Sequence, residues 1–285
     1  MICLLLYVVE LLGIGIVAGI VGALSGLGGG VILIPALSLL MNIPIEYAAG
    51  ASLIATIATS SGAASAYVKD KLTNIRIGMS LEIATTLGAI VGALAAAYIY
   101  SRSLEKVVFV AFGIVLLLSV IHSVIVYKRK KPLRLKSDSS TKLFQLKGSY
   151  YDKSSKKIVK YHGSRWWLGE GIMGIAGIMS GFLGIGSGTL KVLGMDWAMG
   201  LPMKVTTSTS NFMIGVTAAA GSAIYFVAGY IQPFLLAPTV IGILMGSYLG
   251  SKFLEKMRTR EVRMIFTIIL LIAGIEMVLR GIGVA

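Results

Sequence analysis

The sequence has few of the side chains from which disulfide frameworks and metal sites are built. Its 285 residues include one cysteine, Cys3, and two histidines, His122 and His162. A single cysteine excludes an internal disulfide, and two histidines exclude a histidine-based metal cluster. The sequence also has no Ser/His/Asp arrangement, no paired catalytic carboxylates and no zinc-site spacing. We therefore expect no cofactor, no metal site and no enzymatic activity.

Charged residues are scarce, and apolar residues take their place. Only 13% of the residues are charged, 56% are hydrophobic, and the mean hydropathy is +0.87. A soluble domain does not tolerate this composition. The apolar runs are continuous rather than alternating, which excludes a β-barrel, and 35 glycines against 6 prolines suit closely packed membrane helices. We expect an all-α integral membrane protein embedded in a lipid bilayer.

Acidic residues are half as frequent as basic ones, and the excess of basic residues is local. The chain has 26 Lys and Arg against 12 Asp and Glu, but residues 128–165 hold thirteen of the basic residues and only two acids. The charge is therefore a property of one segment, and it does not indicate nucleic-acid binding. Because no Lys or Arg precedes Lys69, the N-terminus lacks the basic start of a cleaved signal peptide, and we interpret it as the first transmembrane segment.

Two glycine-rich stretches interrupt the apolar runs. Gly26-Leu27-Gly28-Gly29-Gly30 returns 158 residues later as Gly184-Ile185-Gly186-Ser187-Gly188. Only short apolar runs follow them, at 31–41 and 189–200, which as helices would reach roughly 16 to 18 Å against a hydrocarbon core of about 30 Å. Paired interrupted segments of this kind indicate a substrate site in a membrane protein.

The chain is an internal duplication with a constant offset of 158 residues. Identical residues recur without a gap, among them Gly13/Gly171, Ala18/Ala176, Pro44/Pro202, Ser52/Ser210, Tyr67/Tyr225 and Gly92/Gly250. We predict segments at 3–24, 31–41, 48–68, 78–100 and 107–127, and again at 167–182, 189–200, 205–227, 234–254 and 264–279. The expected parts are a first repeat (1–127), a linker (128–165) and a second repeat (166–285). Because each repeat has five segments, the second should be inverted relative to the first.

Loop charges give an independent indication of orientation. Lys69, Lys71 and Arg76 lie between the third and fourth segments, whereas the equivalent residues 229–232 are uncharged. Between the ninth and tenth segments the bias is reversed, with five basic residues from 252 to 263. Since basic loops stay in the cytoplasm, we expect a multi-pass protein of the inner membrane, with a cytosolic linker and both termini on the extracytoplasmic side.

Within the linker, residues 142–161 suggest two short strands around a polar turn. This hairpin is either a solvated tether that sets orientation or a site of regulation or partner binding.

The glycine clusters are candidates for anion binding. They let the backbone leave helical geometry, and each opens a half-length helix whose free N–H groups and dipole favour an anion. The alternative is close helix packing without a ligand. The candidate substrate-binding residues from the two clusters are Gly28, Gly29, Gly30, Gly186, Ser187 and Gly188.

Lys191 stands three residues inside the second half-length helix. A lysine at the centre of a membrane helix costs roughly 2.5 to 3.5 kcal/mol, so a compensating partner is expected. A bound anion is one such partner. The alternatives are that Lys191 reaches an interface or pairs with a distant acid such as Glu82. Glu82 itself is a candidate for proton coupling, or an anchor at the membrane interface. The position that matches Lys191 in the first repeat is Leu33.

Hydroxyl-bearing residues cluster near the glycines. Ser52, Thr56, Thr59 and Ser60 share one face of the third segment, and residues 206–211 open the eighth segment. Such groups donate either to an oxyanion or to a neighbouring helix. From these two groups we select four candidate binding residues, namely Ser52, Thr56, Ser210 and Asn211.

The duplicated glycine motifs, with Pro35 after the first and Lys191-Val192 after the second, together with Gly148-Ser149-Tyr150-Tyr151-Asp152 in the linker, resemble the TauE/SafE sulfite exporter family over nearly the whole chain. The resemblance implies transport of sulfur-containing anions, such as sulfite or sulfonates, across the inner membrane. Two positions depart from the family pattern: Ser187 stands where a third central glycine is usual, and Leu193 where a proline is usual.

The sequence therefore favours a secondary transporter of small sulfur-containing oxyanions, and export is the expected direction. Alternating access would occur around a site near the midplane between the repeats. Proton or ion coupling and a homo-oligomer are compatible with this interpretation, and nucleic acid is not an expected partner. The rival hypothesis is a non-transporting membrane scaffold that recruits a partner through the basic linker. An intramembrane enzyme comes third, because the sequence offers no nucleophile and base.

Overall fold

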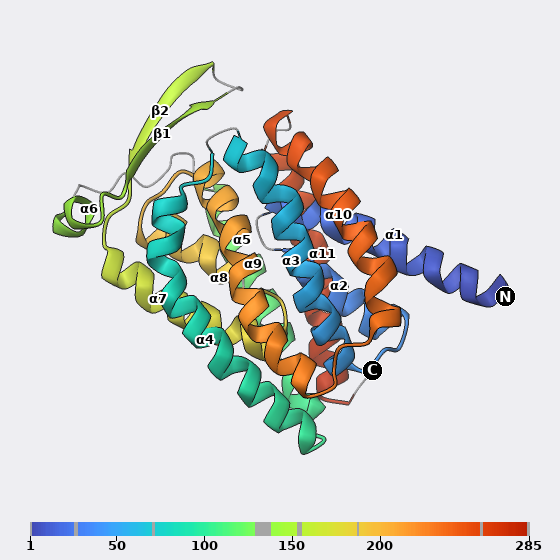
Figure 1. Cartoon of the computed structure of the whole chain (residues 1–285). Helices are drawn as coiled ribbons and strands as arrows, with labels where there is room; N and C mark the ends of the chain where they lie inside the picture. The colour runs from blue at the N-terminus through green and yellow to red at the C-terminus, as the bar shows by residue number, and fades with distance from the viewer. Residues whose placement is uncertain are drawn as a thin grey trace.

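A computed structural model describes residues 2–25, 28–69, 72–128, 138–152, 156–186, 188–256 and 259–283 of the chain, and within these ranges it is predominantly helical (Figure 1). The first half contains α1 (Ile2–Ser25), α2 (Gly30–Pro35), the π-helix η1 (Ala36–Leu40), α3 (Ile45–Lys69), α4 (Ile75–Ser101) and α5 (Glu105–Lys128). The second contains α7 (Trp166–Leu183), α8 (Gly188–Leu193), the π-helix η2 (Gly194–Ala198), α9 (Met203–Val227), α10 (Pro233–Lys256) and α11 (Thr259–Gly281). Between the halves lie α6 (Ser139–Leu143), β1 (Lys147–Asp152) and β2 (Lys157–His162).

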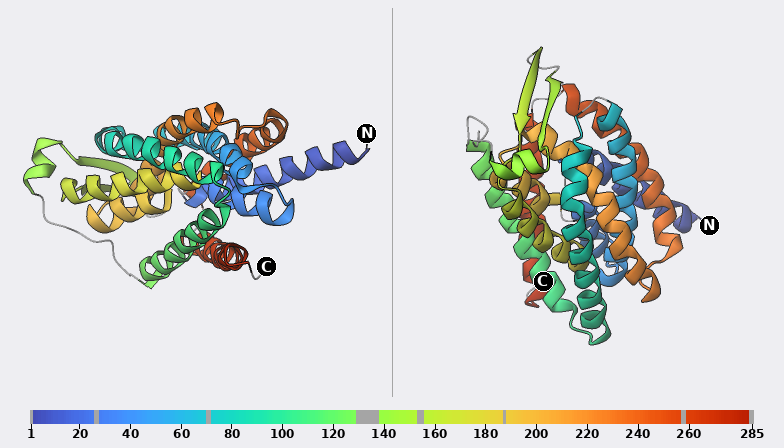
Figure 2. Two further views of the ribbon diagram at one scale, coloured as in Figure 1. Left: turned by 90° about the horizontal axis from the view of Figure 1, so that it is seen from below. Right: turned by 60° about the vertical axis from the view of Figure 1, so that its left-hand side comes forward.

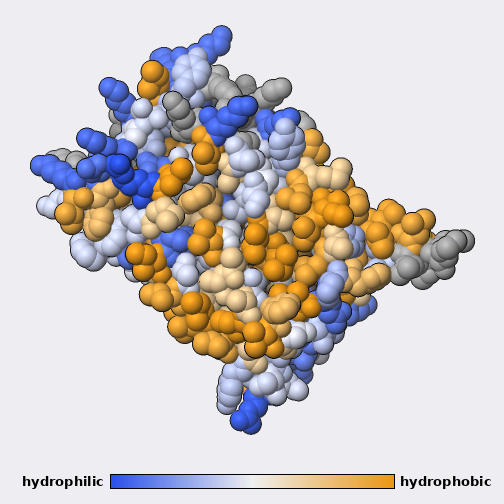
Figure 3. Space-filling model, viewed as in Figure 1, coloured by the Kyte–Doolittle hydropathy of each residue, from blue (hydrophilic) through white to orange (hydrophobic). Residues whose placement is uncertain are grey.

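The helical bundle has the surface of a membrane protein. Within the described residues, α1, α4, α9 and α10 are long and apolar enough to cross a bilayer. Large apolar side chains such as Ile83 and Leu87 on α4 are exposed, and in Figure 3 apolar residues cover the middle of the molecule while polar residues gather at its two ends. Water does not stabilise an exposed apolar surface of this extent, whereas lipid does. The structure thus agrees with the expected all-α membrane class.

The short helices expected after each glycine cluster are present. In each half, six α-helical residues are followed by five π-helical residues, from Gly30 to Leu40 and from Gly188 to Ala198. At 1.5 Å per residue each segment is roughly 16 Å long, which is about half the thickness of the hydrocarbon core. The long helices that come next, α3 and α9, both have 25 residues and begin one residue after Pro44 and Pro202. All these boundaries repeat at the offset of 158 residues.

The helices of the two halves pack in exchanged pairs. Helix α1 packs on α10 and α7 packs on α4, while α3 contacts α9 and α5 contacts α11. Figure 2 shows α5 and α11 side by side, set apart from the other long helices. The exchange extends to single residues: a Cβ at Gly92 would lie 1.9 Å from the carbonyl oxygen of Ile178, and one at Gly250 would lie 2.6 Å from that of Ile20. Gly250 is the repeat equivalent of Gly92, and Ile178 is the repeat equivalent of Ile20. The two contacts are therefore equivalent, with the halves exchanged.

Two buried tyrosines fix the ends of the helices that lead into the glycine clusters. The Tyr67 hydroxyl of α3 donates to the Ala23 carbonyl of α1 at 2.9 Å, and the Tyr225 hydroxyl of α9 donates to the Gly181 carbonyl of α7 at 3.1 Å. Both side chains are fully buried. Because the same bond forms at equivalent places in both halves, each glycine turn is attached to the long helix that follows it.

The linker folds into a hairpin at one end of the bundle. β1 and β2 pair antiparallel, with Lys147 opposite His162 and Asp152 opposite Lys157. Figures 1 and 2 show that the two strands extend beyond the ends of the helices, with α6 beside the start of α7. The predicted hairpin is therefore present in the described part of the linker.

Candidate functional site

The two glycine turns meet between α3 and α9. A Cβ added at Gly28 would lie 3.0 Å from Ile214 Cδ1 and 3.2 Å from Thr56 Cγ2. One added at Gly186 would lie 2.6 Å from Thr56 Cγ2 and 3.4 Å from Ile214 Cβ. Thr56 and Ile214 occupy equivalent positions in the two halves, so both turns converge on one pair of facing residues. The two glycine stretches, which are 158 residues apart in the sequence, therefore lie together at one place, as expected for a site between the repeats.

Glycine is required in these turns for backbone conformation as well as for space. Gly28, Gly184 and Gly186 have φ angles of +81°, +74° and +71°. L-residues with side chains rarely adopt this region, and glycine enters it without steric cost. Of the candidate residues in the clusters, Ser187 lies outside the described residues, as do Gly26 and Leu27 of the first motif.

The N-terminus of α2 is enclosed by hydroxyl groups of α3. The Gly29 N–H donates to Thr59 Oγ1 at 3.4 Å, and a Cβ at Gly30 would lie only 2.2 Å from Ser52 Oγ and 2.9 Å from Thr56 Oγ1. Ser52 in turn donates to the Gly184 carbonyl of the opposite turn at 2.6 Å. Ser52 and Thr59 therefore behave as structural hydrogen-bonding groups, which was one of the two predicted roles.

Thr56 differs from its neighbours on the same face of α3. Its side chain is fully buried, and its Oγ1 has no hydrogen-bond partner among the described residues. An unsatisfied buried hydroxyl costs about 1 to 3 kcal/mol. A polar group left in this state at the meeting point of two duplicated turns is suited to receive a ligand.

The second half contributes a buried polar group from α9. Asn211 donates through Nδ2 to the Ala23 carbonyl at 3.0 Å, and its Oδ1 has no partner among the described residues. Ser210 is fully buried beside it on the same helix, and Gly188, at the start of α8, is also buried. The position equivalent to Asn211 is Leu53, so this amide has no counterpart in the first half.

Lys191 is fully buried and is compensated within the protein. Its Nζ donates to Thr217 Oγ1 and lies 4.0 Å from Glu82 Oε2. Thr217 Oγ1 also lies at hydrogen-bond distance, 2.6 Å, from Glu82 Oε1. Lys191 thus pairs with Glu82 through a bridging hydroxyl, as one of the alternatives predicted. A bound anion is not needed to explain the buried charge, and anion binding by Lys191 stays a prediction.

Glu82 is turned into the protein and is only 5% exposed. It does not serve as an anchor at the membrane interface. Its Oε1 accepts hydrogen bonds from Thr217 and, at 3.2 Å, from Thr86, while its Oε2 has no hydrogen-bond partner among the described residues. The sequence analysis did not select Thr86 or Thr217 as site residues. Thr86 follows Glu82 by four positions on one helix, which places the two side chains on one face. Thr217 is the repeat equivalent of Thr59. These two sequence relations could have marked both residues as candidates, although they do not indicate which groups the side chains contact.

The geometry described above, two glycine turns that meet at a buried polar centre, can be compared with known proteins. The profile of the family described as sulfite exporter TauE/SafE matches residues 11–277. The chain belongs to the TauE/SafE family. Membership identifies it as a membrane transporter of the TauE/SafE type, as the duplicated motifs suggested.

Relatives of this TauE/SafE chain match it over most of its length. A probable membrane transporter protein of Bacillus subtilis, YunE, is 29% identical over 281 residues, which cover 96% of this chain and 98% of YunE. A second from the same bacterium, YdhB, is 26% identical over 245 residues and covers 86% and 87% of the two chains. A third, from Methanocaldococcus jannaschii, is 26% identical over 281 residues and covers 93% of each chain. No solved structure matches the chain.

Proposed function

We propose that this TauE/SafE protein is a secondary transporter of small sulfur-containing oxyanions, such as sulfite or organosulfonates, and that export is the favoured direction. The observation that carries the proposal is the convergence of both glycine turns on Thr56, whose buried hydroxyl has no hydrogen-bond partner among the described residues. An oxyanion accepts hydrogen bonds in all directions, so it matches a buried hydroxyl that is placed where two half-length helices begin. The sulfite exporter description of the family supports the choice of sulfur oxyanions.

The proposed mechanism is a rocking motion of the two halves, residues 1–127 and 166–285, around this centre. The halves are taken to be inverted, each with five segments, with the 128–165 linker in the cytosol and both termini outside. The reversed bias of the loop charges and the exchanged contacts of the helices support this arrangement. Since Ser52 joins α3 to the opposite turn, a change in the relation of the halves would directly reshape the site.

The Lys191–Glu82 pair gives the site a means of coupling to protons. While Glu82 is ionised, it neutralises Lys191. A proton taken up at Glu82 Oε2, which has no hydrogen-bond partner within the described ranges, would leave the Thr217 bond to Oε1 in place and leave the Lys191 charge uncompensated. An anion entering beside Lys191 would restore neutrality. Uptake of one proton with each anion is therefore the proposed form of coupling.

Flux in proteoliposomes tests the proposed function. The purified protein is reconstituted and offered sulfite, sulfate, thiosulfate, an organosulfonate and a phosphonate, with and without a pH gradient. We expect saturable, protein-dependent flux of sulfite or the sulfonate that changes with the pH gradient, and no comparable flux of the phosphonate. Absence of protein-dependent flux with every anion of the panel would overturn the proposal.

A further inference from the structure

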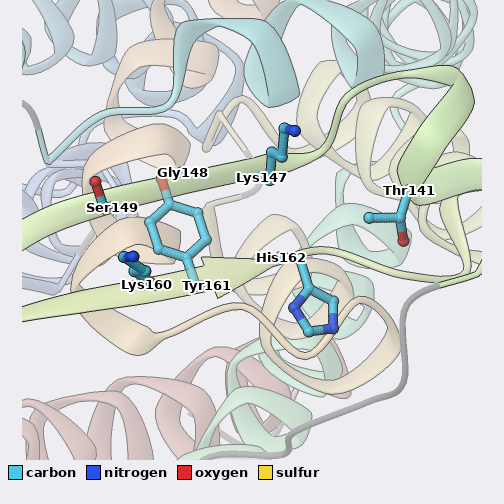
Figure 4. Close-up of a pocket in the computed structure, with 7 residues that line it drawn as sticks. All are labelled: Thr141, Lys147, Gly148, Ser149, Lys160, Tyr161 and His162. Atoms are coloured by element: carbon cyan, nitrogen blue, oxygen red, sulfur yellow. The ribbon is translucent and has the colours of Figure 1, made fainter.

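The hairpin of the linker, with α6, lines a cavity at the end of the bundle where α4 begins. The cavity has a volume of about 480 Å³ and is lined by α6 and the two strands (Figure 4). Its charged lining residues are Lys147 and Lys160, with His162 beside them, and no acidic residue is among those that line it. The volume lies within the range of about 300 to 1,000 Å³ that is typical of sites for small molecules.

The strand register places the two lysines on one face of the hairpin. Lys147 is opposite His162, and Ser149 is opposite Lys160. Directly opposed side chains of an antiparallel pair share a face, so Lys147 and Lys160 are diagonal neighbours on the same face. The Cα atoms of such neighbours are roughly 7 to 8 Å apart. Within the described part of the chain, neither ammonium group makes an ion pair. Two uncompensated ammonium groups on one face of a hairpin repel each other, and an anion bound beside them would reduce that repulsion.

The acids closest to the lysines in the linker already have partners. Asp152 pairs with Lys204 of α9 at 2.7 Å. Asp138 accepts hydrogen bonds from Ser140, from Thr141 and from the Arg165 N–H. The positive charge on the cavity face is therefore not balanced by either acid. In addition to the lysines, the Ser149 hydroxyl lies on that face as a donor.

We propose that this cavity binds the phosphate group of a small phosphorylated molecule. Two ammonium groups and a hydroxyl match a tetrahedral oxyanion with a double charge, and charge-assisted hydrogen bonds of this kind are the strong ones. The volume exceeds that of the phosphate group alone and leaves room for an organic part. This site is separate from the site proposed for transport, which lies between the glycine turns inside the bundle.

Equilibrium dialysis of the full-length protein tests the proposal with radiolabelled inorganic phosphate and adenosine monophosphate as probes. In detergent without anionic lipid we expect saturable binding of both. Lys147→Gln/Lys160→Gln should weaken the affinity at least tenfold. The control pair Lys142→Gln/Lys157→Gln removes the same charge from exposed positions that do not line the cavity, and it should leave the affinity within about twofold. Absence of saturable binding, or an equal loss in the control pair, would overturn the inference.

Two further arms identify the source of the phosphate and separate the two sites. Repeating the dialysis in nanodiscs of phosphatidylcholine alone or with added phosphatidylglycerol shows whether a lipid headgroup competes. Retained binding assigns the cavity to a soluble molecule, and displacement assigns it to a lipid phosphate. If transport assays fail while the phosphate binding persists, only the proposed transport function is refuted.

Discussion

A substitution of Thr56 gives the most direct test of the proposed anion-binding site. Its hydroxyl is buried and has no hydrogen-bond partner in the part of the chain that the structure describes, so replacement by the isosteric valine removes no hydrogen bond seen in the unliganded protein. We expect Thr56→Val to unfold at the same or a higher denaturant concentration than the parent chain. If an oxyanion takes a hydrogen bond from Thr56, its affinity should fall about tenfold or more, because hydrogen bonds to charged groups contribute about 1.5 to 3 kcal/mol.

Thr59→Val is the matched control for this substitution. Thr59 lies on the same face of α3, but its hydroxyl donates to the Ala55 carbonyl and accepts from the Gly29 N–H. Its replacement should therefore lower stability by about 1 kcal/mol. Anion affinity measured by thermal shift or flux in both variants decides the matter. Equal affinity in Thr56→Val and the parent would remove Thr56 from the site.

The Lys191–Glu82 pair predicts strong coupling between two substitutions. Lys191→Met or Glu82→Gln alone removes one partner of a buried ion pair, which typically destabilises by about 3 to 5 kcal/mol. The double variant removes both charges and should be substantially more stable than the sum of the single effects predicts. Unfolding in detergent measures the coupling, with Leu33→Met as the equivalent neutral change in the first half. Additive effects would show that the pair does not interact.

Flux through the double variant separates structure from function. If Lys191 and Glu82 only stabilise the fold, the double variant should transport as well as the parent chain. If they bind and couple, it should fold but lose pH-driven flux. We expect the second result.

For single residues, the sequence identified side chains of unusual type, but it did not identify all of their contacts. Lys191 was conspicuous because a lysine in an apolar run needs a partner, and Glu82 was one of the partners considered. The bridging role of Thr217 was not predictable, since it depends on the rotation of α9 relative to α4 and α8. The free hydroxyl of Thr56 was likewise hidden, because Ser52, Thr56 and Thr59 are equivalent in sequence and differ only in which carbonyls they reach.

At the scale of the element, the first half-length helix depends on the absence of a side chain at its first residue. A Cβ at Gly30 would lie 2.2 Å from Ser52 Oγ and 3.4 Å from the Ile185 Cα of the opposite turn. Gly30→Ala should therefore separate the two turns and destabilise the protein by about 1 to 3 kcal/mol. Gly13→Ala is the control, because nothing lies within 4 Å of a Cβ there and alanine is the better helix former by about 1 kcal/mol. Thermal unfolding that ranks Gly30→Ala at or above Gly13→Ala would contradict this account.

The helix boundaries were largely predictable, and the helix geometry was not. Apolar runs bounded by glycine, proline and charge placed the half-length segments at 31–41 and 189–200, close to the observed ends. The five π-helical residues that close each segment carry no comparable signal. They arise from how each short helix is fitted between its neighbours, and this is a property of packing rather than of local sequence.

The short helix α6 is stabilised by a charged cap with a defined pH dependence. Burial acts to raise the pKa of Asp138, but the hydrogen bonds from Ser140, Thr141 and the Arg165 N–H together hold that pKa well below its usual range. A carboxyl group with a lowered pKa contributes stability that is complete above its unfolded pKa of about 3.9 and is lost as the pH falls through the folded value. Between pH 7 and about pH 5 the cap should therefore not weaken.

Hydrogen exchange measures this cap directly. After correction for the intrinsic rate, protection of the Thr141 and Arg165 amides should be equal at pH 7 and pH 5. Asp138→Ala should reduce that protection at least tenfold at both values. Asp152→Ala, which removes the partner of Lys204 instead, should leave the two amides protected. A loss of protection between pH 7 and pH 5 in the parent chain would contradict the lowered pKa.

For the whole molecule, the duplication was visible in the sequence and the assembly of the halves was not. A constant offset of 158 residues shows that two similar units exist, but it does not say which helices touch. In the structure the helices of the two halves pack in exchanged pairs. Gly92 contacts Ile178, and Gly250 contacts Ile20 in the equivalent way. The docking of the hairpin was equally hidden, because the contact of Tyr161 with Asn74 joins residues 87 positions apart.

The orientation of the whole molecule can be tested along α4. This helix has 27 residues and is thus roughly 40 Å long, enough to carry its two ends to opposite sides of a bilayer. It begins beside the hairpin, where Asn74 contacts Tyr161, and it ends at the exposed Ser101. Since Lys69, Lys71 and Arg76 mark the beginning of α4 as cytosolic, Ser101 should face the outside.

Cysteine labelling in intact cells converts this into a measurement. In a chain that lacks its natural Cys3, an impermeant maleimide should label Ser101→Cys at once. Ser149→Cys, which is exposed on β1, should be labelled only after the membrane is permeabilised. Labelling of Ser149→Cys alone in intact cells would reverse the proposed orientation, because the same basic loops would then lie outside. Labelling of both positions from outside would mean that α4 does not cross the membrane. That result would contradict the proposed site between two inverted halves.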